Sequence, residues 1–177
     1  SAADASLGGI IFTNALSQEI MLAGGNKNLL ADVMGKATDA KSSLIACASF
    51  ANPSENGVTV EAVNTKDTYA LNGSIEYVVL GGFAGYALVP AKIKGQDGYS
   101  YFLVDTADRG YAKSEPVVSL GLHACPAVDV KLTGVEGKRI GQAGEGEKYF
   151  SKASDRMHAA VAAIQCGIMK GSFQEAF

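Results

Sequence analysis

The sequence predicts an α+β fold: a mostly antiparallel β-barrel or sandwich domain flanked by N-terminal helices and a long C-terminal helix. Apolar residues recur at helical spacing near both ends of the chain, and they alternate with polar residues at period two in between. Glycine makes up 21 of 177 residues, against a usual share of about 7%. Such an excess favours a β region rich in tight turns.

Residues 1–41 are predicted to be helical, because Leu16, Ile20 and later apolar residues recur at helical spacing. The sequence Gly-Gly-Asn at 24–26 divides the segment into two helices. Glycine is common just past the end of a helix, and asparagine is a common residue at a helix start.

The middle of the chain is predicted to form short strands separated by turns. Asn72-Gly73 indicates a hairpin turn, since both residues tolerate positive φ, and a further turn is expected at residues 64–67. No segment is long enough for a helical crossover, so the strands should be mostly antiparallel. The predicted strands are 44–50, 58–63, 69–71, 75–80, 86–93, 99–105, 117–120 and 128–135.

Residues 145–177 are predicted to form one long amphipathic helix with an apolar stripe that includes Phe150, Met157 and Ile164. The helical pattern runs to Phe177 without a glycine cap or a proline stop. We therefore expect the chain to be a truncated piece of a longer protein.

Composition excludes several classes of function. A net charge of −3 without basic clusters gives no reason to expect nucleic-acid binding. No run approaches the ~20 apolar residues of a membrane span, and no signal peptide is recognisable, so we expect a cytoplasmic protein. Cys47, Cys125 and Cys166 lie far apart without metal-site spacing, which predicts reduced thiols and no metal site.

Several segments, in order, resemble the acyl-CoA dehydrogenase family. Residues 69–73 (Tyr-Ala-Leu-Asn-Gly) and 75–82 are similar to the family's Y-x-L-N-G-x-K-x-W-I-T-N-G motif. Residues 102–105 (Phe-Leu-Val-Asp) look like its F-L-V strand, and 120–126 resemble its L-G-x-R-x-S segment. Residues 140–146 match the L-G-x-x-G-x-G pattern before its next helix. Each motif alone is weak, but the ordered set is specific and covers nearly the whole chain.

The resemblance implies a domain organisation and a chemistry. Residues 1–41 would end an N-terminal helical domain, 42–144 would form the central β-barrel domain, and 145–177 would begin a C-terminal helical domain. Such enzymes hold FAD against the β-domain. A carboxylate removes the α-proton of an acyl-CoA thioester, a hydride passes to the flavin, and electrons leave to an electron-transfer flavoprotein. The parent protein is expected to be a homo-oligomer.

The resemblance also nominates site residues. Ser49, Tyr77 and Val79 occupy flavin-contacting positions, and Asp155 and His158 occupy substrate-contacting positions. Val79 stands where the family has a threonine and cannot donate a hydrogen bond. Each position has a structural alternative: Ser49 could end a strand before an Asn-Pro turn, Tyr77 could be a half-buried strand aromatic, and His158 could pack between helices.

No residue of this chain matches the family's catalytic carboxylate, which lies beyond the position where the matching segment ends. General-base catalysis requires such a group within reach of the proton, so we expect this chain alone to be inactive. Phe50 and Val79 depart from the flavin-contacting pattern, which keeps open a degenerate, non-redox relative acting as a binding or structural subunit. A free-standing β-barrel that binds acyl chains or lipids is the third hypothesis.

Overall fold

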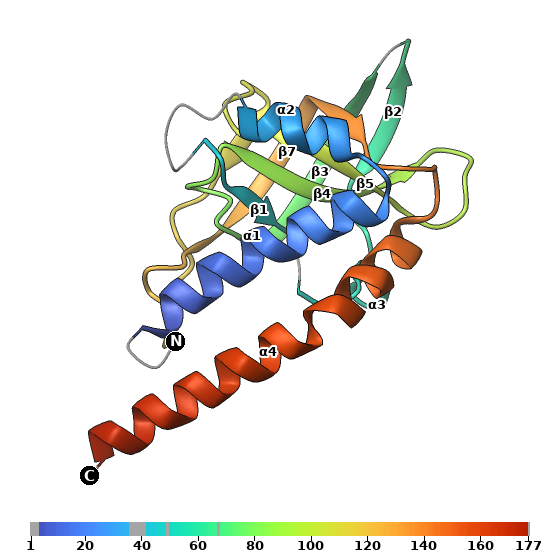
Figure 1. Ribbon diagram of the computed structural model, residues 1–177. Helices are drawn as coiled ribbons and strands as arrows, with labels where there is room; N and C mark the ends of the chain where they lie inside the picture. The colour runs from blue at the N-terminus through green and yellow to red at the C-terminus, as the bar shows by residue number, and fades with distance from the viewer. Residues whose placement is uncertain (1–3, 36–41, 49, 67, 177) are drawn as a thin grey trace.

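A computed structural model describes residues 4–35, 42–48, 50–66 and 68–176 of the protein. Two N-terminal helices lie against one side of a seven-stranded sheet, and a long C-terminal helix runs past them (Figure 1). The predicted α+β fold with helices at both ends is confirmed. The finer description of the sheet as a barrel or sandwich stays a prediction.

The N-terminal helices are α1 (Ala5–Ala23) and α2 (Lys27–Gly35). Helix α1 begins after Asp4, whose carboxylate accepts a hydrogen bond from the Ser6 amide at 2.8 Å. The predicted break between the helices is confirmed, with Gly25 at φ +81°. The Asn26 side chain accepts a hydrogen bond from the Gly141 amide at 2.8 Å, which ties this break to the segment preceding the last helix.

The sheet is predominantly antiparallel, as predicted, with parallel pairing of β1 with β4 and of β2 with β4. The strand order is β1-β3-β2-β4-β5-β7-β6, and β1–β4 and β3–β7 pair in addition. A short helix, α3, spans Pro53–Asn56. The strands are β1 (Ile45–Cys47), β2 (Glu61–Thr65), β3 (Thr68–Val79), β4 (Tyr86–Ile93), β5 (Ser100–Asp105), β6 (Tyr111–Lys113) and β7 (Ala127–Arg139).

The hairpin predicted at Asn72-Gly73 is wrong, because both residues lie inside the single strand β3. The chain reverses between β2 and β3 instead, where Thr65 pairs with Thr68. Glycine is needed at 73 for two reasons. Its φ is +143°, and a Cβ there would lie 2.6 Å from the Thr59 carbonyl oxygen. A glycine within a strand can therefore mark a close backbone approach as readily as a turn.

The strand predicted at residues 117–120 is also wrong. This stretch belongs to the loop between β6 and β7, where Val118 and Leu120 are almost fully exposed. Strand β6 pairs with Val130 and Leu132 of β7. Past β6, the loop contacts β7 through the hydrogen bond from the Val117 amide to the Ala127 carbonyl at 2.8 Å, without forming a strand. Short apolar stretches do not specify a strand without a pairing partner.

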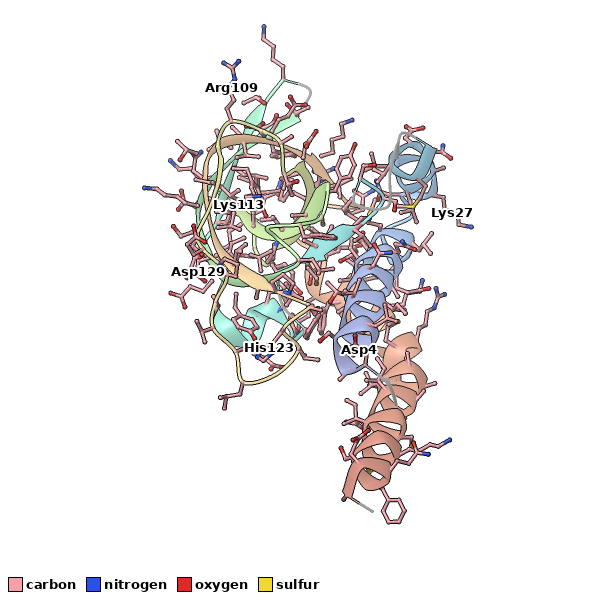
Figure 2. All side chains as sticks on the ribbon, turned by 90° about the vertical axis from the view of Figure 1, so that its left-hand side faces the viewer. Asp4, Lys27, Arg109, Lys113, His123 and Asp129 are labelled. Atoms are coloured by element: carbon pink, nitrogen blue, oxygen red, sulfur yellow. The ribbon has the colours of Figure 1, made fainter. Side chains whose placement is uncertain are left out.

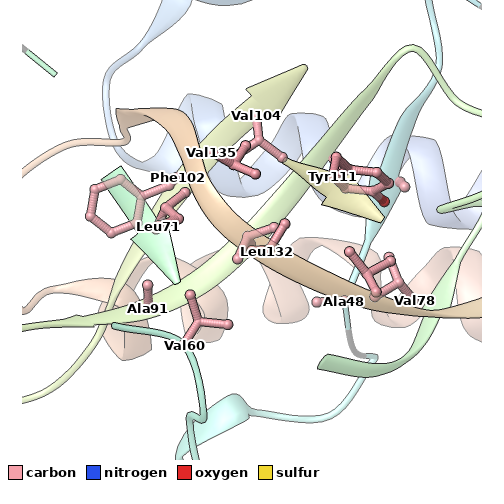
Figure 3. Packing of buried hydrophobic residues seen from close by; sticks show 14 of the residues in the cluster. Ala48, Val60, Leu71, Val78, Ala91, Phe102, Val104, Tyr111, Leu132 and Val135 are labelled. Carbon is pink, nitrogen blue, oxygen red and sulfur yellow. The ribbon is translucent and has the colours of Figure 1, made fainter. Parts of the chain in front are cut away.

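The buried residues form two clusters. One fills the interior of the sheet, where Leu71, Phe102 and Val135 pack together (Figure 3). The other joins the helices to the sheet, with Ile20 of α1 and Leu88 of β4 among its fully buried members.

The C-terminal helix α4 (Gly146–Ala176) agrees with the predicted helix to within a residue at each end. Its first turns are anchored by Tyr149, Phe150, Ala153 and Met157, all buried. The rest of the helix extends away from the sheet (Figure 1), and Met169 is 62% exposed. Among the residues that the structure describes, no helix has the combined length and apolar character of a membrane span.

Candidate functional site

An irregularity in β3 presents an aromatic side chain to solvent. The β3–β7 register shifts between Ile75 and Val78, so that Glu76 and Tyr77 together face Asp129 of β7. We call this feature the Tyr77 bulge. Such bulges re-aim side chains and are common beside active sites. The Tyr77 side chain is 51% exposed, whereas Val78 is 1% exposed.

The backbone of Tyr77 has a φ of +59°, in the left-handed region that bulky side chains rarely adopt. Its amide donates a hydrogen bond to the Asp129 carboxylate at 2.9 Å. Figure 2 shows Asp129 and Lys113 on the far side of the sheet from α1 and α4.

A hollow of about 420 Å³ opens next to the bulge, and we call it the bulge hollow. It has both apolar and polar walls, with Glu76 of the bulge among them. It is lined by Ala48, Pro53, Gly57, Thr59, Ser74, Ile75, Glu76 and Pro90. A cavity of this size lies within the usual range for small-molecule sites.

A second opening lies between the first and last long helices, and we call it the α1–α4 groove. One part of about 290 Å³ is lined by Gly8, Ile11, Phe12, Ala15, Met157, Ala160, Ala163 and Ile164. A second part of about 170 Å³ is lined by Ala5, Gly9, Phe12, Leu122, Val161, Ile164, Gln165 and Ile168. Phe12 and Ile164 belong to both linings, so the two parts are continuous. Small side chains from both helices leave the space open, and nearly all of the lining is apolar.

Two residues of one segment, Ala48 and Phe50, relate the bulge hollow to the groove. Phe12 of the groove packs edge-to-face on Phe50, with ring centroids 5.4 Å apart. Ala48, two positions before Phe50, lines the bulge hollow.

Burial keeps two acidic groups near these surfaces in their neutral forms. Desolvation raises the pKa of the Tyr111 hydroxyl, which donates a hydrogen bond to the Gly81 carbonyl at 3.0 Å. Desolvation likewise raises the pKa of the Cys125 thiol, partly offset by a hydrogen bond with Thr13. Cys125 lies against Gly9 of the groove. Neither group adds charge at neutral pH.

The residues predicted to contact flavin have different surroundings. Tyr77 lies at the surface on the bulge, beside the bulge hollow. Val79 is 5% exposed and packs in the interior of the sheet, so its side chain does not share the surface of Tyr77. Ser49 lies outside the described residues.

The residues predicted to contact the substrate, Asp155 and His158, are exposed on α4, one helical turn apart. Neither residue lines the α1–α4 groove, so neither would contact an acyl chain bound inside it. The roles predicted for both remain predictions.

Sequence reasoning missed the most specific contacts of the site. Asp129 stands in an ordinary alternating strand, and nothing in its neighbours signals a bond to a bulge on another strand. Phe12 could have been found, because it lies four residues before Leu16 on the predicted helix. Ala163 lies on the predicted last helix, and in the structure it borders the open groove.

Relatives of known type match the chain in sequence. The caffeyl-CoA reductase–Etf complex subunit CarC of Acetobacterium woodii is 29% identical over 126 residues, covering 68% of this chain and 33% of that protein. The short-chain-specific acyl-CoA dehydrogenase of Clostridium acetobutylicum is 30% identical over 122 residues, covering 65% of this chain and 32% of that protein. The chain thus spans about a third of the length of these relatives. No family model matches the chain.

Solved structures share the fold. Butyryl-CoA dehydrogenase from Megasphaera elsdenii aligns with a TM-score of 0.79 and 24% identity, over 99% of this chain and 48% of that one. The sequence relatives and the shared fold support the resemblance of this chain to acyl-CoA dehydrogenases.

FAD is the cofactor that the family resemblance implies, and the residues present can be compared with it. An exposed aromatic face suits stacking against a flat ring, and Tyr77 provides one on the bulge, outside the lining of the bulge hollow. Val79 provides no polar atom and is buried. Tyr77 thus offers a flavin an aromatic side chain at the surface, and the flavin contacts predicted for Tyr77 and Val79 both stay predictions.

Proposed function

We propose that this chain forms the cofactor- and acyl-binding part of a flavoprotein that desaturates acyl-CoA thioesters or reduces their enoyl counterparts. The observation that carries the proposal is the presence of two unlike surfaces in one chain. The Tyr77 bulge with its hollow suits a flat ring, and the α1–α4 groove suits an apolar chain. A reaction between cofactor and substrate requires the two to be held side by side.

In this proposal each surface of the chain has a separate task. Tyr77 stacks on the ring, and the walls of the bulge hollow keep water from it. The Phe12–Phe50 pair and the alanines of α4 hold the acyl chain. FAD, when bound, supplies the acceptor or donor of the hydride exchanged with the β-carbon of the thioester. The base that handles the α-proton is proposed to come from outside this chain, which alone would not turn over acyl-CoA.

The partners follow from the same proposal. The ligand would be an acyl-CoA thioester, and an electron-transfer flavoprotein would exchange electrons with the bound flavin. The name of the Acetobacterium relative, a subunit of an Etf complex, supports this second partner. The predicted homo-oligomeric state and cytoplasmic location stand as further proposals.

A second candidate is a relative that keeps the fold and binds ligands without redox chemistry. The observation that favours it is Val79, where an aliphatic, buried side chain replaces a potential donor to the flavin. The two candidates separate on cofactor uptake. A chain that binds acyl-CoA but takes up no FAD at millimolar concentration supports the second candidate and contradicts the first.

The acyl part of the proposal is tested by filling the groove. Ala163→Trp should weaken the binding of butyryl-CoA by about tenfold or more, because a large side chain would occupy the lining at that point. Binding is measured by isothermal titration calorimetry.

Ala162→Trp is the matched control, since Ala162 is also exposed on α4 but does not line the groove. It should bind butyryl-CoA as the unmodified chain does. Equal affinities in the two variants, or no binding by the unmodified chain at millimolar ligand, would contradict the groove as the acyl site.

A further inference from the structure

The Tyr77 bulge is held by a side chain that the family resemblance did not nominate. On β3, Glu76 and Tyr77 fill the space opposite the single residue Asp129 of β7. A bulge leaves one amide without its ladder partner. Here the Tyr77 amide donates to the Asp129 carboxylate at 2.9 Å, which replaces the missing backbone acceptor with a charged one.

Asp129 is itself fixed at both of its backbone groups. Its amide donates to the Ser114 hydroxyl at 3.0 Å, and its carbonyl accepts a hydrogen bond from the Ser114 amide at 2.9 Å. Asp129 lies in the interior of β7, with β3 on one side and β6 on the other. The carboxylate is therefore presented to the bulge from a fixed backbone.

The bulge is a conformation that needs such support. A left-handed φ is unfavourable for tyrosine because its Cβ approaches the carbonyl oxygen. Residues held in this region persist when their surroundings determine them, and they gather at ligand sites. Without the Asp129 carboxylate as acceptor, β3 and β7 could pair in a regular register. Because side chains alternate between the two faces of a strand, the Tyr77 side chain would then point in another direction.

We propose that Asp129 is a positioning residue, which holds the Tyr77 ring at the surface as a preformed face for the flavin. This inference rests on the proposed function, since it concerns the same cofactor site. Asp129 acts through the Tyr77 amide, and contact with the cofactor belongs to Tyr77. The apparent affinity for a ligand falls in proportion to the fraction of molecules in the competent conformation.

Charge provides an internal check on this role. A second hollow of about 360 Å³ beside the bulge has Glu76, Lys113, Asp129 and Lys131 among its lining residues. FAD carries negative phosphates, so removing the Asp129 charge would by electrostatics alone favour its binding. The positioning role predicts the opposite effect, namely that loss of the Asp129 side chain weakens FAD binding.

In the test, the 177-residue chain is titrated with FAD, and the chemical shifts of its backbone amides in NMR spectra report the binding. Asp129→Ala removes the acceptor and should weaken FAD binding by about fivefold. Asp129→Asn keeps an acceptor oxygen and should stay within about twofold of the unmodified chain. The Tyr77 amide resonance, in the absence of FAD, should move in Asp129→Ala far more than in Asp129→Asn.

Asp97→Ala is the control for charge, because Asp97 is exposed in the loop between β4 and β5. It should bind FAD as tightly as the unmodified chain or slightly more tightly. Thermal unfolding of each variant separates a local change from a loss of the fold. Should Asp129→Ala prove unstable, the Asp129→Asn and Asp129→Ser pair provides the same contrast, since a serine side chain is too short to reach the amide.

The possible failures are distinguishable. If the unmodified chain takes up no FAD, the proposed function fails and the positioning role fails with it. If it binds FAD and Asp129→Ala binds equally well with an unchanged Tyr77 amide, only the positioning role is overturned. Equal weakening in Asp129→Ala, Asp129→Asn and Asp97→Ala would likewise contradict it, because the loss would not depend on the acceptor.

Discussion

The two proposed ligand surfaces are built in different ways. The Tyr77 bulge lies on paired strands, with a left-handed backbone conformation that an aspartate supports. The α1–α4 groove lies between two helices that pack loosely past Met157. A flat ring needs an aromatic face in a defined place, whereas an acyl chain is satisfied by any apolar lining of sufficient volume. The bulge is therefore defined by specific backbone contacts, and the groove by its volume and apolar lining.

The largest expected effect contrasts the sheet interior with the outer part of α4. Phe102→Ala should lower the free energy of unfolding by about 3–5 kcal/mol, because it empties a site that is 0% exposed. Met169→Ala, at a 62% exposed position, should change it by less than about 0.5 kcal/mol. Urea denaturation measures both. Similar losses in the two variants would remove the contrast between the regions.

The next largest effect on stability is expected at Gly73, inside β3. Gly73→Ala should cost about 1–3 kcal/mol, since φ is +143° and the new Cβ would meet backbone atoms of Thr59 and Val60, which cannot move aside easily. Gly121→Ala is the control, because its Cβ would enter open space. Denaturation midpoints compare the two. A neutral Gly73→Ala would mean that the strand does not pass this close to residues 59 and 60.

Alkaline pH should weaken the junction between helices and sheet. Burial raises the pKa of Tyr99 to about 12, above its ordinary value near 10. The folded state holds the proton more tightly, so the stabilisation is complete below pH 10 and is lost as the pH rises towards 12. The slope is at most about 1.4 kcal/mol per pH unit for one proton.

The control for this pH dependence is Tyr99→Phe, which removes the titrating group and the hydrogen bond to Asn52. Its free energy of unfolding should fall less steeply between pH 10 and 12, with a remainder from Tyr101, Tyr111 and Tyr149, whose pKa values burial also raises. Parallel profiles for the two proteins would show that Tyr99 does not contribute.

The smallest effect is expected where α1 and α4 are joined by charge. Arg156 and Glu19 form an ion pair at 2.9 Å, with 55% and 27% of the side chains exposed. Breaking it with Arg156→Ala should cost no more than about 1 kcal/mol, because solvent screens an exposed pair. A double-mutant cycle with Glu19→Ala, repeated at high salt, measures the coupling. A coupling well above that figure would mean that the groove side is more rigid than we describe.

The sequence predicted elements best where the pattern was long or continuous. The strand at 86–93 has the predicted bounds, because its nearly unbroken apolar run can be buried on both faces. The last helix was predicted because its stripe persists over several turns. The predictions for Asn72-Gly73 and for residues 117–120 were wrong. Whether a glycine serves a turn or a close backbone approach depends on other segments of the chain, and so does the partner with which a strand pairs.

The site was less predictable than the fold. The motif placed Tyr77 in a flavin-contacting position, and the structure gives it an exposed ring at a bulge. Periodicity could not show that Val78 and Val79 would both be buried after that bulge, because a bulge shifts the alternation of side chains. The hydrogen bond from Tyr77 to Asp129 joins residues 52 positions apart, which no local pattern reports.

The most direct test of two distinct ligand surfaces is NMR mapping of FAD and of butyryl-CoA on the same sample. FAD should shift amides at residues 74–78 and at Asp129, whereas the acyl group should shift amides of α1 and α4 around Phe12 and Ile164. With both ligands present, the two sets should appear together. If both ligands perturb one set of amides, or if neither perturbs these regions at millimolar concentration, the account is contradicted.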